Sequence, residues 1–123
     1  MAIRFDHNDE EIYKDRGKVY NELKQYQQAI SDYTFAIQLN PRDATAYSYR
    51  AAIYTNLGEY QQAISDCTEA IKLDPSGSTA YFQRGMVYML IGNKQNYCSD
   101  IATVCRLGEC SFYDLARQGG LCR

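Results

Sequence analysis

The chain has 123 residues and a formal net charge of -2, enough for one domain with a moderate core. Its Lys and Arg residues form no block, which argues against nucleic acid as the main partner. No apolar run is long enough for a membrane helix, and residues 1–14, MAIRFDHNDEEIYK, lack the apolar stretch of a signal peptide. We therefore expect a cytoplasmic protein that does not insert into a membrane.

The sequence repeats itself with a period of 34 residues. Residues 25–41, QYQQAISDYTFAIQLNP, return as residues 59–75, EYQQAISDCTEAIKLDP, with five of seventeen positions changed. A fixed period of this length is typical of a solenoid, in which similar units stack and each unit contacts its neighbours. The repeat therefore predicts a stack of units whose surface binds another molecule.

Each unit is predicted to contain two helices, after a flexible tail at residues 1–8. Large residues at positions 4, 11 and 14, with a small residue at position 8, give the first helix one apolar face. Lys24 or a glycine at its equivalents ends this helix, and a second helix runs on to Pro41 or Pro75. The three units span residues 9–42, 43–76 and 77–110.

The third unit departs from the pattern at its end. Tyr97 replaces a small residue, Ile101 replaces an aromatic one, and Glu109 replaces the proline. The sequence of residues 111–118, SFYDLARQ, reads as a seventh helix that covers the last apolar face, and two glycines end it. We therefore predict a capping helix and tail at residues 111–123.

This pattern resembles the tetratricopeptide repeat family, in which a large residue, a small one, Tyr, Ala, an aromatic and Pro recur at these offsets. The resemblance covers residues 9–110. It implies an all-α fold, a right-handed α-solenoid of three helix-turn-helix repeats with a seventh capping helix. It also implies a protein–protein interaction module that binds a peptide segment of a partner, because the first helices of this family line a concave groove.

Carried over position by position, the resemblance implies a groove that is charged and mixed at one end and apolar at the other. Tyr49, Phe82 and Met86 are expected to form one patch that anchors an apolar side chain. The alternative is that Met86, Met89 or Leu90 is buried under the capping helix. The implied groove residues are Lys14, Asp15, Lys18, Asn21, Tyr49, Ala52, Asn56, Phe82, Gln83 and Met86.

Some members of the family act as chaperone adaptors and hold the carboxylates of a C-terminal tail. They use Lys and Asn in the first unit, Asn in the second, and Lys and Arg in the third. The matching residues here are Lys14, Lys18, Tyr49, Thr79 and Gln83. Only Lys14 agrees, so we predict that this chain is not a receptor for chaperone tails.

Two charged positions recur with the period. Arg16, Arg50 and Arg84 each lie between two tyrosines, and we expect their guanidinium groups to stack on those rings. The alternative is a ladder that binds anions. Asp32, Asp66 and Asp100 are expected to lie on a solvated face.

Four of the five cysteines lie in the last quarter of the chain, and Cys67 is expected to be a buried thiol. If disulfides form, an antiparallel capping helix favours the pairs Cys105–Cys110 and Cys98–Cys122. Free thiols, two disulfides and a zinc site with four thiolates remain open as alternatives. Disulfides would imply an oxidising compartment, contrary to the expected cytoplasmic location.

Nothing in the sequence points to catalysis or to a cofactor. There is no glycine-rich phosphate loop and no paired-carboxylate motif, and the one histidine, His7, lies in the expected tail. We therefore predict a binding protein with no metal and no catalytic residues. The alternatives are a scaffold that associates weakly with itself and a protein that responds to redox state or metal through its C-terminal cysteines.

Overall fold

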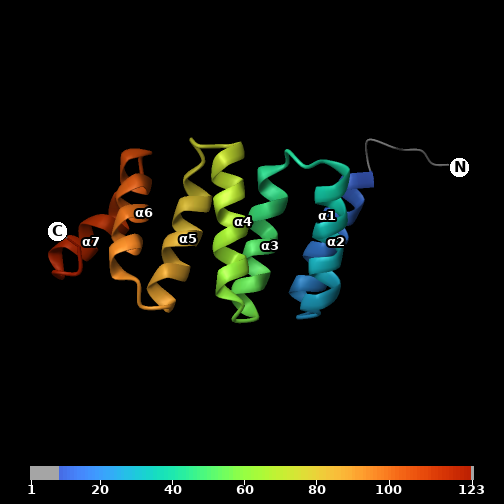
Figure 1. Cartoon of the computed structure of the whole chain (residues 1–123), viewed down its shortest axis with the longest axis horizontal. Helices are drawn as coiled ribbons and strands as arrows, with labels where there is room; N and C mark the ends of the chain where they lie inside the picture. The colour runs from blue at the N-terminus through green and yellow to red at the C-terminus, as the bar shows by residue number, and fades with distance from the viewer. Residues whose placement is uncertain (1–8, 123) are drawn as a thin grey trace, which may run out of the picture.

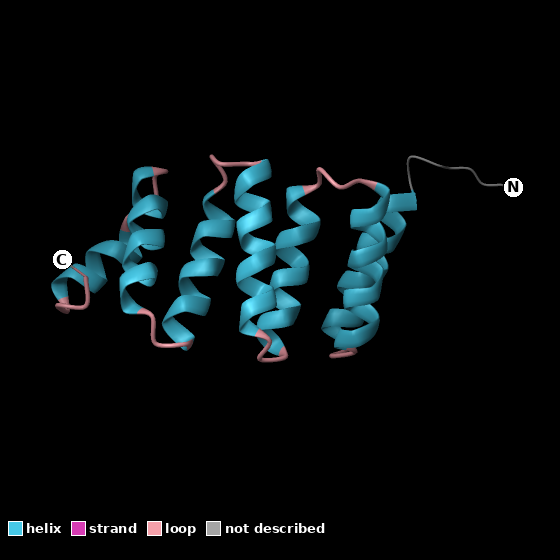
Figure 2. Ribbon diagram, in the orientation of Figure 1, coloured by secondary structure: helices cyan, strands magenta, loops and turns pink. Residues whose placement is uncertain are grey.

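The computed structural model describes residues 9–122, so the expected tail at residues 1–8, with His7, lies outside the described residues. The described chain is helical and contains no strand (Figure 2). Its seven helices are α1 (Asp9–Glu22), α2 (Tyr26–Leu39), α3 (Ala44–Asn56), α4 (Tyr60–Leu73), α5 (Ser78–Leu90), α6 (Lys94–Arg106) and α7 (Ser111–Gln118).

The helices form three antiparallel hairpins that stand side by side, with α7 at the far end of the row (Figure 1). Within the row, the second helix of one hairpin packs on the first helix of the next. For example, Tyr33 of α2 and Ile53 of α3 belong to one buried cluster. This arrangement is the all-α solenoid that the period predicts.

The turn inside each hairpin has the same geometry. The second residue after the first helix adopts a left-handed backbone, with φ of 62° at Lys24, 77° at Gly58 and 82° at Gly92. The next residue then donates its N–H back to a tyrosine carbonyl, as Gln25 does to Tyr20 at 2.8 Å. This bond closes the end of the helix, and glycine is the residue that adopts the conformation without strain.

The small residue at position 8 is matched to the side chain that faces it. A Cβ added to Gly17 would lie 2.9 Å from Cε2 of Tyr33, so a larger residue does not fit there without a shift. In the second hairpin Ala51 and Cys67 occupy the equivalent positions and belong to one buried cluster. Where the first helix carries the larger residue, Ala51 in place of glycine, the facing helix carries the smaller one, Cys67 in place of tyrosine.

The three recurring aspartates are buried, so the expected solvated face is wrong. Asp32, Asp66 and Asp100 are 4%, 5% and 3% exposed. Each accepts two hydrogen bonds from the arginine on the first helix of its own hairpin, at 2.7–2.9 Å. A buried carboxylate needs such a partner, because removing it from water is otherwise unfavourable.

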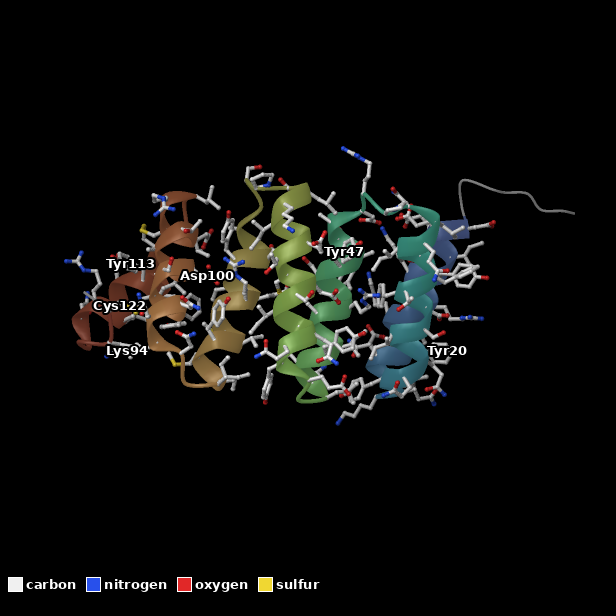
Figure 3. The ribbon with its side chains drawn as sticks, viewed as in Figure 1. Tyr20, Tyr47, Lys94, Asp100, Tyr113 and Cys122 are labelled. Atoms are coloured by element: carbon white, nitrogen blue, oxygen red, sulfur yellow. A yellow bond between two sulfur atoms is a disulfide. The ribbon has the colours of Figure 1, made fainter. Side chains whose placement is uncertain are left out.

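The arginines also have the packing role that the sequence suggests. Each guanidinium carbon lies 5.5–5.9 Å from the centroids of two tyrosine rings. Figure 3 shows Tyr20 and Tyr47 in this set, and Asp100 between α5 and α6. In α3 and α5 the arginine reaches back to the preceding hairpin, where Arg50 donates to Thr34 and Arg84 to Thr68.

The C-terminal helix covers the last hairpin. Ala116 and Cys122 join Tyr97 and Ile101 of α6 in one buried cluster, against which Tyr113 packs. Figure 3 shows Tyr113 and Cys122 at this end of the molecule.

Of the three cysteine alternatives, the structure has two disulfides: Cys98–Cys122, with Cα atoms 5.6 Å apart, and Cys105–Cys110. Cys67 is a buried free thiol.

Candidate functional site

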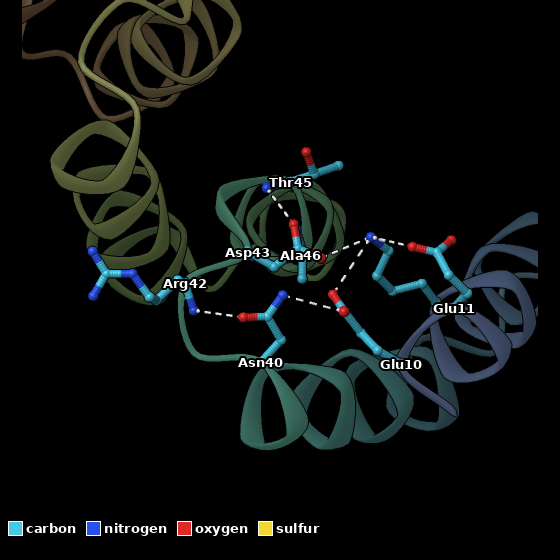
Figure 4. A network of polar contacts seen from close by, with 8 residues as sticks. Glu10, Glu11, Asn40, Arg42, Asp43, Thr45 and Ala46 are labelled. Carbon is cyan, nitrogen blue, oxygen red and sulfur yellow. Dashed lines mark hydrogen bonds and ion pairs between the residues drawn. The ribbon is translucent and has the colours of Figure 1, made fainter. Parts of the chain in front are cut away.

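At the N-terminal end of the candidate groove, Lys14 of α1 is surrounded by carboxylates (Figure 4). Its Nζ lies 2.7 Å from Oδ2 of Asp43, 3.2 Å from Oε2 of Glu11 and 3.7 Å from Oε2 of Glu10. Burial lowers the pKa of Lys14, but the hydrogen bonds to Asp43 and Glu11 outweigh burial and raise the pKa above its ordinary value. Lys14 is therefore charged, and its charge is already compensated within the protein.

The acidic partners of Lys14 connect two hairpins. Asp43 precedes α3 and accepts hydrogen bonds from the backbone N–H groups of Thr45 and Ala46, which makes it the N-cap. Asn40, at the end of α2, donates to Glu10 at 3.2 Å (Figure 4). The hydrogen bond with Asp43 raises the pKa of Glu10. These contacts tie α1 to the turn between α2 and α3.

Further along the groove, Lys18 of α1 faces Tyr49 of α3. The Nζ atom lies 5.5 Å from the centroid of the Tyr49 ring, a cation–π distance. Tyr49 is 39% exposed and stacks on Tyr33 with ring centroids 5.6 Å apart. Burial raises the pKa of Tyr33 to about 12, so that phenol stays neutral beneath the exposed ring. An aromatic face next to a cation is thus available to a ligand.

Between α3 and α5 the groove deepens into a cavity of about 300 Å³. Its wall includes Ser48, Tyr49, Thr79 and Gln83. Gln83 donates from Nε2 to the carbonyl of Ser48 at 3.0 Å, whereas its Oε1 is buried and accepts from no donor within residues 9–122. A buried acceptor without a donor is unfavourable, and a ligand N–H group would relieve this cost.

A second cavity, of about 260 Å³, lies between α5 and α7. The Phe82 ring of α5 and the Phe112 ring of α7 are in contact, with centroids 4.8 Å apart, and both line this cavity. Thr79 lines both cavities. The capping helix therefore completes the apolar end of the groove. Sequence reasoning missed Phe112, because α7 has no counterpart in the repeats.

The three residues of the expected patch, Tyr49, Phe82 and Met86, have different surroundings. Met86 is half-buried and packs against the buried cluster beneath α7, so it has only part of the burial that the alternative expected. Met89 and Leu90 are not covered in this way, since they are 39% and 59% exposed. Tyr49 and Phe82 instead line two neighbouring cavities.

The remaining groove residues predicted from the sequence differ in exposure. Asp15 and Asn56 are exposed, and Ala52 is half-buried. Asn21 is half-buried, and its Oδ1 is a second buried oxygen that accepts no hydrogen bond from residues 9–122. The groove thus combines unsatisfied amide acceptors with aromatic surface, which is the chemistry that suits a polypeptide.

Within residues 9–122, no group of three or more His, Cys, Asp or Glu side chains is placed to hold a metal ion. No helix of that segment is long and apolar enough to cross a membrane.

A stack of helical hairpins with a groove along its first helices defines the class of helical-repeat binding proteins. A family model for the tetratricopeptide repeat matches residues 10–43 and 44–76. The chain belongs to the tetratricopeptide repeat family, whose domains are protein–protein interaction modules.

Solved structures with this fold cover nearly the whole chain. The tetratricopeptide domain of Arabidopsis OM64 is 30% identical, with a TM-score of 0.84 over 93% of this chain and 94% of that chain. The first such domain of Spaghetti (RPAP3), bound to the HSP90 peptide SRMEEVD, is 25% identical, with a TM-score of 0.85 over 98% and 95%. The second domain of human RPAP3, in complex with the HSP70 peptide SGPTIEEVD, is 30% identical, with a TM-score of 0.83 over 94% and 96%.

These comparisons bear on the exclusion of chaperone tails. Because similar domains bind HSP90 and HSP70 peptides, the comparisons do not support the prediction that this chain is no chaperone-tail receptor. A search of the curated proteins finds no match.

Proposed function

We propose that the chain binds an extended peptide segment of a partner protein in the groove along α1, α3 and α5. The observation that carries the proposal is the cavity beside Gln83, whose buried Oε1 lacks a donor while Nε2 is held by Ser48. An extended peptide presents backbone N–H groups at regular intervals, and these are the donors that such an acceptor requires.

The second cavity supplies the expected anchor. Phe82 and Phe112 together line one part of a space of about 260 Å³, which suits an apolar side chain of the peptide. Thr79 lies on the rim of both cavities, so neighbouring residues of one peptide would enter them in turn. Lys18 and Asp15 on α1 would then fix the direction of the charged part of the peptide.

We further propose that binding does not depend on a clamp for two carboxylates. Lys14 is the one residue that matches that clamp, and three carboxylates already surround it. Thr79 and Gln83 add no positive charge where a clamp would place Lys and Arg. A doubly charged tail would therefore find little compensating charge here.

The peptide proposal is tested by selecting peptides from a displayed library of random heptamers on the oxidised chain of 123 residues. Affinities of the selected peptides are then measured by fluorescence anisotropy. We expect the Tyr49→Ala, Phe82→Ala variant to bind at least about tenfold more weakly, the loss typical of removing anchor residues. Thr79→Tyr, which fills the shared rim without removing a core contact, should give a similar loss.

Lys72→Ala is the matched control, since Lys72 lies on the exposed side of α4 and, among residues 9–122, pairs only with Glu69. Equal affinity of all four proteins would remove the groove proposal. Unfolding midpoints of the variants, measured in parallel, separate lost binding from lost folding.

The clamp proposal has its own probe, the peptide SRMEEVD and the same peptide with an amidated C-terminus. We expect weak binding of both by the natural chain. A variant with Lys18→Asn, Tyr49→Asn, Thr79→Lys and Gln83→Arg should gain affinity for the free-acid peptide alone. Tight binding of the free acid by the natural chain, lost on amidation, would show that the exclusion is wrong.

The two disulfides also bear on location. Disulfides persist mainly in oxidising compartments, so Cys98–Cys122 and Cys105–Cys110 support such a compartment rather than the cytoplasmic one expected from the sequence. Weak self-association, and a response of the cap to redox state, remain predictions from the sequence.

A further inference from the structure

The outward side of α1 carries an apolar surface at the end of the stack, away from the groove. We define this α1 end face by Ile12, Arg16, Val19 and Leu23. Ile12 is 57% exposed and Val19 is 52% exposed. The outer faces of terminal units in a solenoid are usually polar, so two exposed aliphatic side chains at this place require an explanation.

The repeat period shows what these positions do in the other hairpins. The residues equivalent to Ile12 are Ala46 and Ala80, which are 0% and 6% exposed. The residues equivalent to Val19 are Ile53 and Val87, which are 1% and 2% exposed. The same two positions are therefore apolar in all three hairpins and are buried in the two hairpins that have a predecessor.

The element that covers them is the second helix of the preceding hairpin. Ala46 and Ile53 of α3 share a buried cluster with Ala29 and Tyr33 of α2. In the next hairpin, Val87 of α5 is buried with residues of α4. The covering surface thus consists of an alanine and a second residue on one side of a second helix, Ala29 with Tyr33 on α2 and Ala63 with Cys67 on α4.

Arg16 shows the same difference in its hydrogen bonds. Arg50 and Arg84 each use Nη1 to donate to a threonine hydroxyl on the covering helix, at 3.0 Å to Thr34 and 3.2 Å to Thr68. Arg16 forms the two bonds to Asp32, and no acceptor for its Nη1 lies within residues 9–122. Its side chain is 56% exposed, against 17% for Arg50 and 20% for Arg84.

We propose that the α1 end face docks the second helix of a tetratricopeptide-type hairpin from a partner protein. Apolar side chains of that helix, equivalent to Ala29 and Tyr33 or to Ala63 and Cys67 here, would cover Ile12 and Val19. A threonine or serine hydroxyl would accept a hydrogen bond from Nη1 of Arg16. The two internal junctions of this chain, α2 with α3 and α4 with α5, define both the geometry and the chemistry of the partner. This surface and the groove lie on different sides of α1, so one partner does not exclude the other.

The test uses a known covering element as the probe. A copy of residues 43–76 is placed directly before Asp9, in place of residues 1–8, which keeps the period and brings the copied Thr68 into register with Arg16. If the face docks such a hairpin, the extended chain unfolds in urea in one transition with a higher midpoint. Its denaturant slope should rise by about a third, because the slope scales with the surface exposed on unfolding.

Two variants make the test specific. Ile12→Asp with Val19→Asp should leave the midpoint of the natural chain nearly unchanged, but should cancel the gain of the extended chain. Thr68→Val in the added copy alone should cancel part of that gain, because it removes the hydroxyl and keeps the shape.

Three outcomes would overturn the proposal. Separate unfolding of the added hairpin at lower urea would show that the face does not accept it. A marked destabilisation of the natural chain by the double variant would mean that a segment of the chain itself covers the face. A concentration-dependent dimer in sedimentation, abolished by the double variant, would identify a second copy as the occupant.

Discussion

Arg50 and Asp66 form a two-bond ion pair across the second hairpin, with Nε 2.7 Å from Oδ2 and Nη2 2.8 Å from Oδ1. The hydrogen bond to Asp66 raises the pKa of Arg50, so the guanidinium remains charged. Because Nη1 also donates to Thr34, one side chain joins α3, α4 and the preceding α2. The same contacts recur at Arg84 with Asp100 and Thr68.

Asp66→Asn should therefore destabilise the fold strongly. It leaves a largely buried guanidinium without its counter-charge, a change that typically costs about 3 kcal/mol or more. Urea unfolding followed by circular dichroism measures the loss. Asp32→Asn is the matched control and should cost clearly less, since Arg16 is open to water. Equal losses at the two sites would contradict a role for burial of the arginine.

Gly17→Ala should also destabilise the chain, although alanine usually favours a helix over glycine. The new methyl would lie 2.9 Å from the Tyr33 ring, and such overpacking typically costs about 1–3 kcal/mol. The double variant with Tyr33→Cys copies the Ala51–Cys67 pairing of the second hairpin. In that background Gly17→Ala should be neutral or stabilising. A double-mutant cycle with no coupling energy between positions 17 and 33 would show that their sizes are not matched.

Lys24→Gly should stabilise the chain by about 0.5–1 kcal/mol. Lys24 holds φ of 62°, whereas its equivalents are glycines at 77° and 82°. A left-handed backbone costs a residue with a side chain about 1–2 kcal/mol, and glycine avoids this cost. The greater freedom of glycine in the unfolded state offsets part of the stabilisation. Lys24→Ala keeps the strained backbone and should not stabilise. A thermal unfolding midpoint that is equal for both variants would contradict this account.

The cysteines can be counted directly. A sample prepared without reductant should show no rapidly reacting thiol when folded, one when denatured, and all five when denatured and reduced. The folded chain is unreactive because burial raises the pKa of Cys67 to about 12, and the thiolate is the reactive form. Five thiols in the unreduced, denatured sample would rule out both disulfides.

Stability should fall as the pH rises above about 9. The Cys67 thiol and the Tyr33 phenol have pKa values of 9.0 and 10.0 in ordinary surroundings, and burial raises each to about 12 in the fold. Between these values the unfolded chain loses protons that the folded chain keeps, so the free energy of unfolding decreases with pH. In Cys67→Ala the decline should begin about one pH unit later, because the phenol alone remains. Urea unfolding at several pH values between 8 and 11 tests this, and an identical onset in both proteins would contradict it.

The periodic parts of the molecule are the parts that the sequence predicts well. Identical spacing of large, small and helix-ending residues is enough to place three hairpins and the first helices that line the proposed groove. The burial of Asp66 was missed because an aspartate on a second helix looks solvated when that helix is considered alone. Its partner Arg50 recurs at a constant separation of 16 residues, which spans the hairpin and could have revealed the pair.

The features outside the period were not predictable in the same way. Phe112 has no equivalent in the other units, so nothing in the pattern places it opposite Phe82. Met86 occupies a groove position by register, yet α7 adds a neighbour that the inner hairpins lack. Which groove positions face a ligand therefore depends on how the cap packs, and this follows from the three-dimensional structure.

The two disulfides of the cap are nested, since the short loop closed by Cys105 and Cys110 lies wholly inside the loop of sequence separation 24 closed by Cys98 and Cys122. Neither loop threads the other, so the bonds can form in either order without topological obstruction. A backbone cut at Gly119-Gly120 would also leave the severed end attached through Cys122. Proteolysis of the exposed cap would then produce a nicked molecule of unchanged mass on a non-reducing gel, rather than a shortened one.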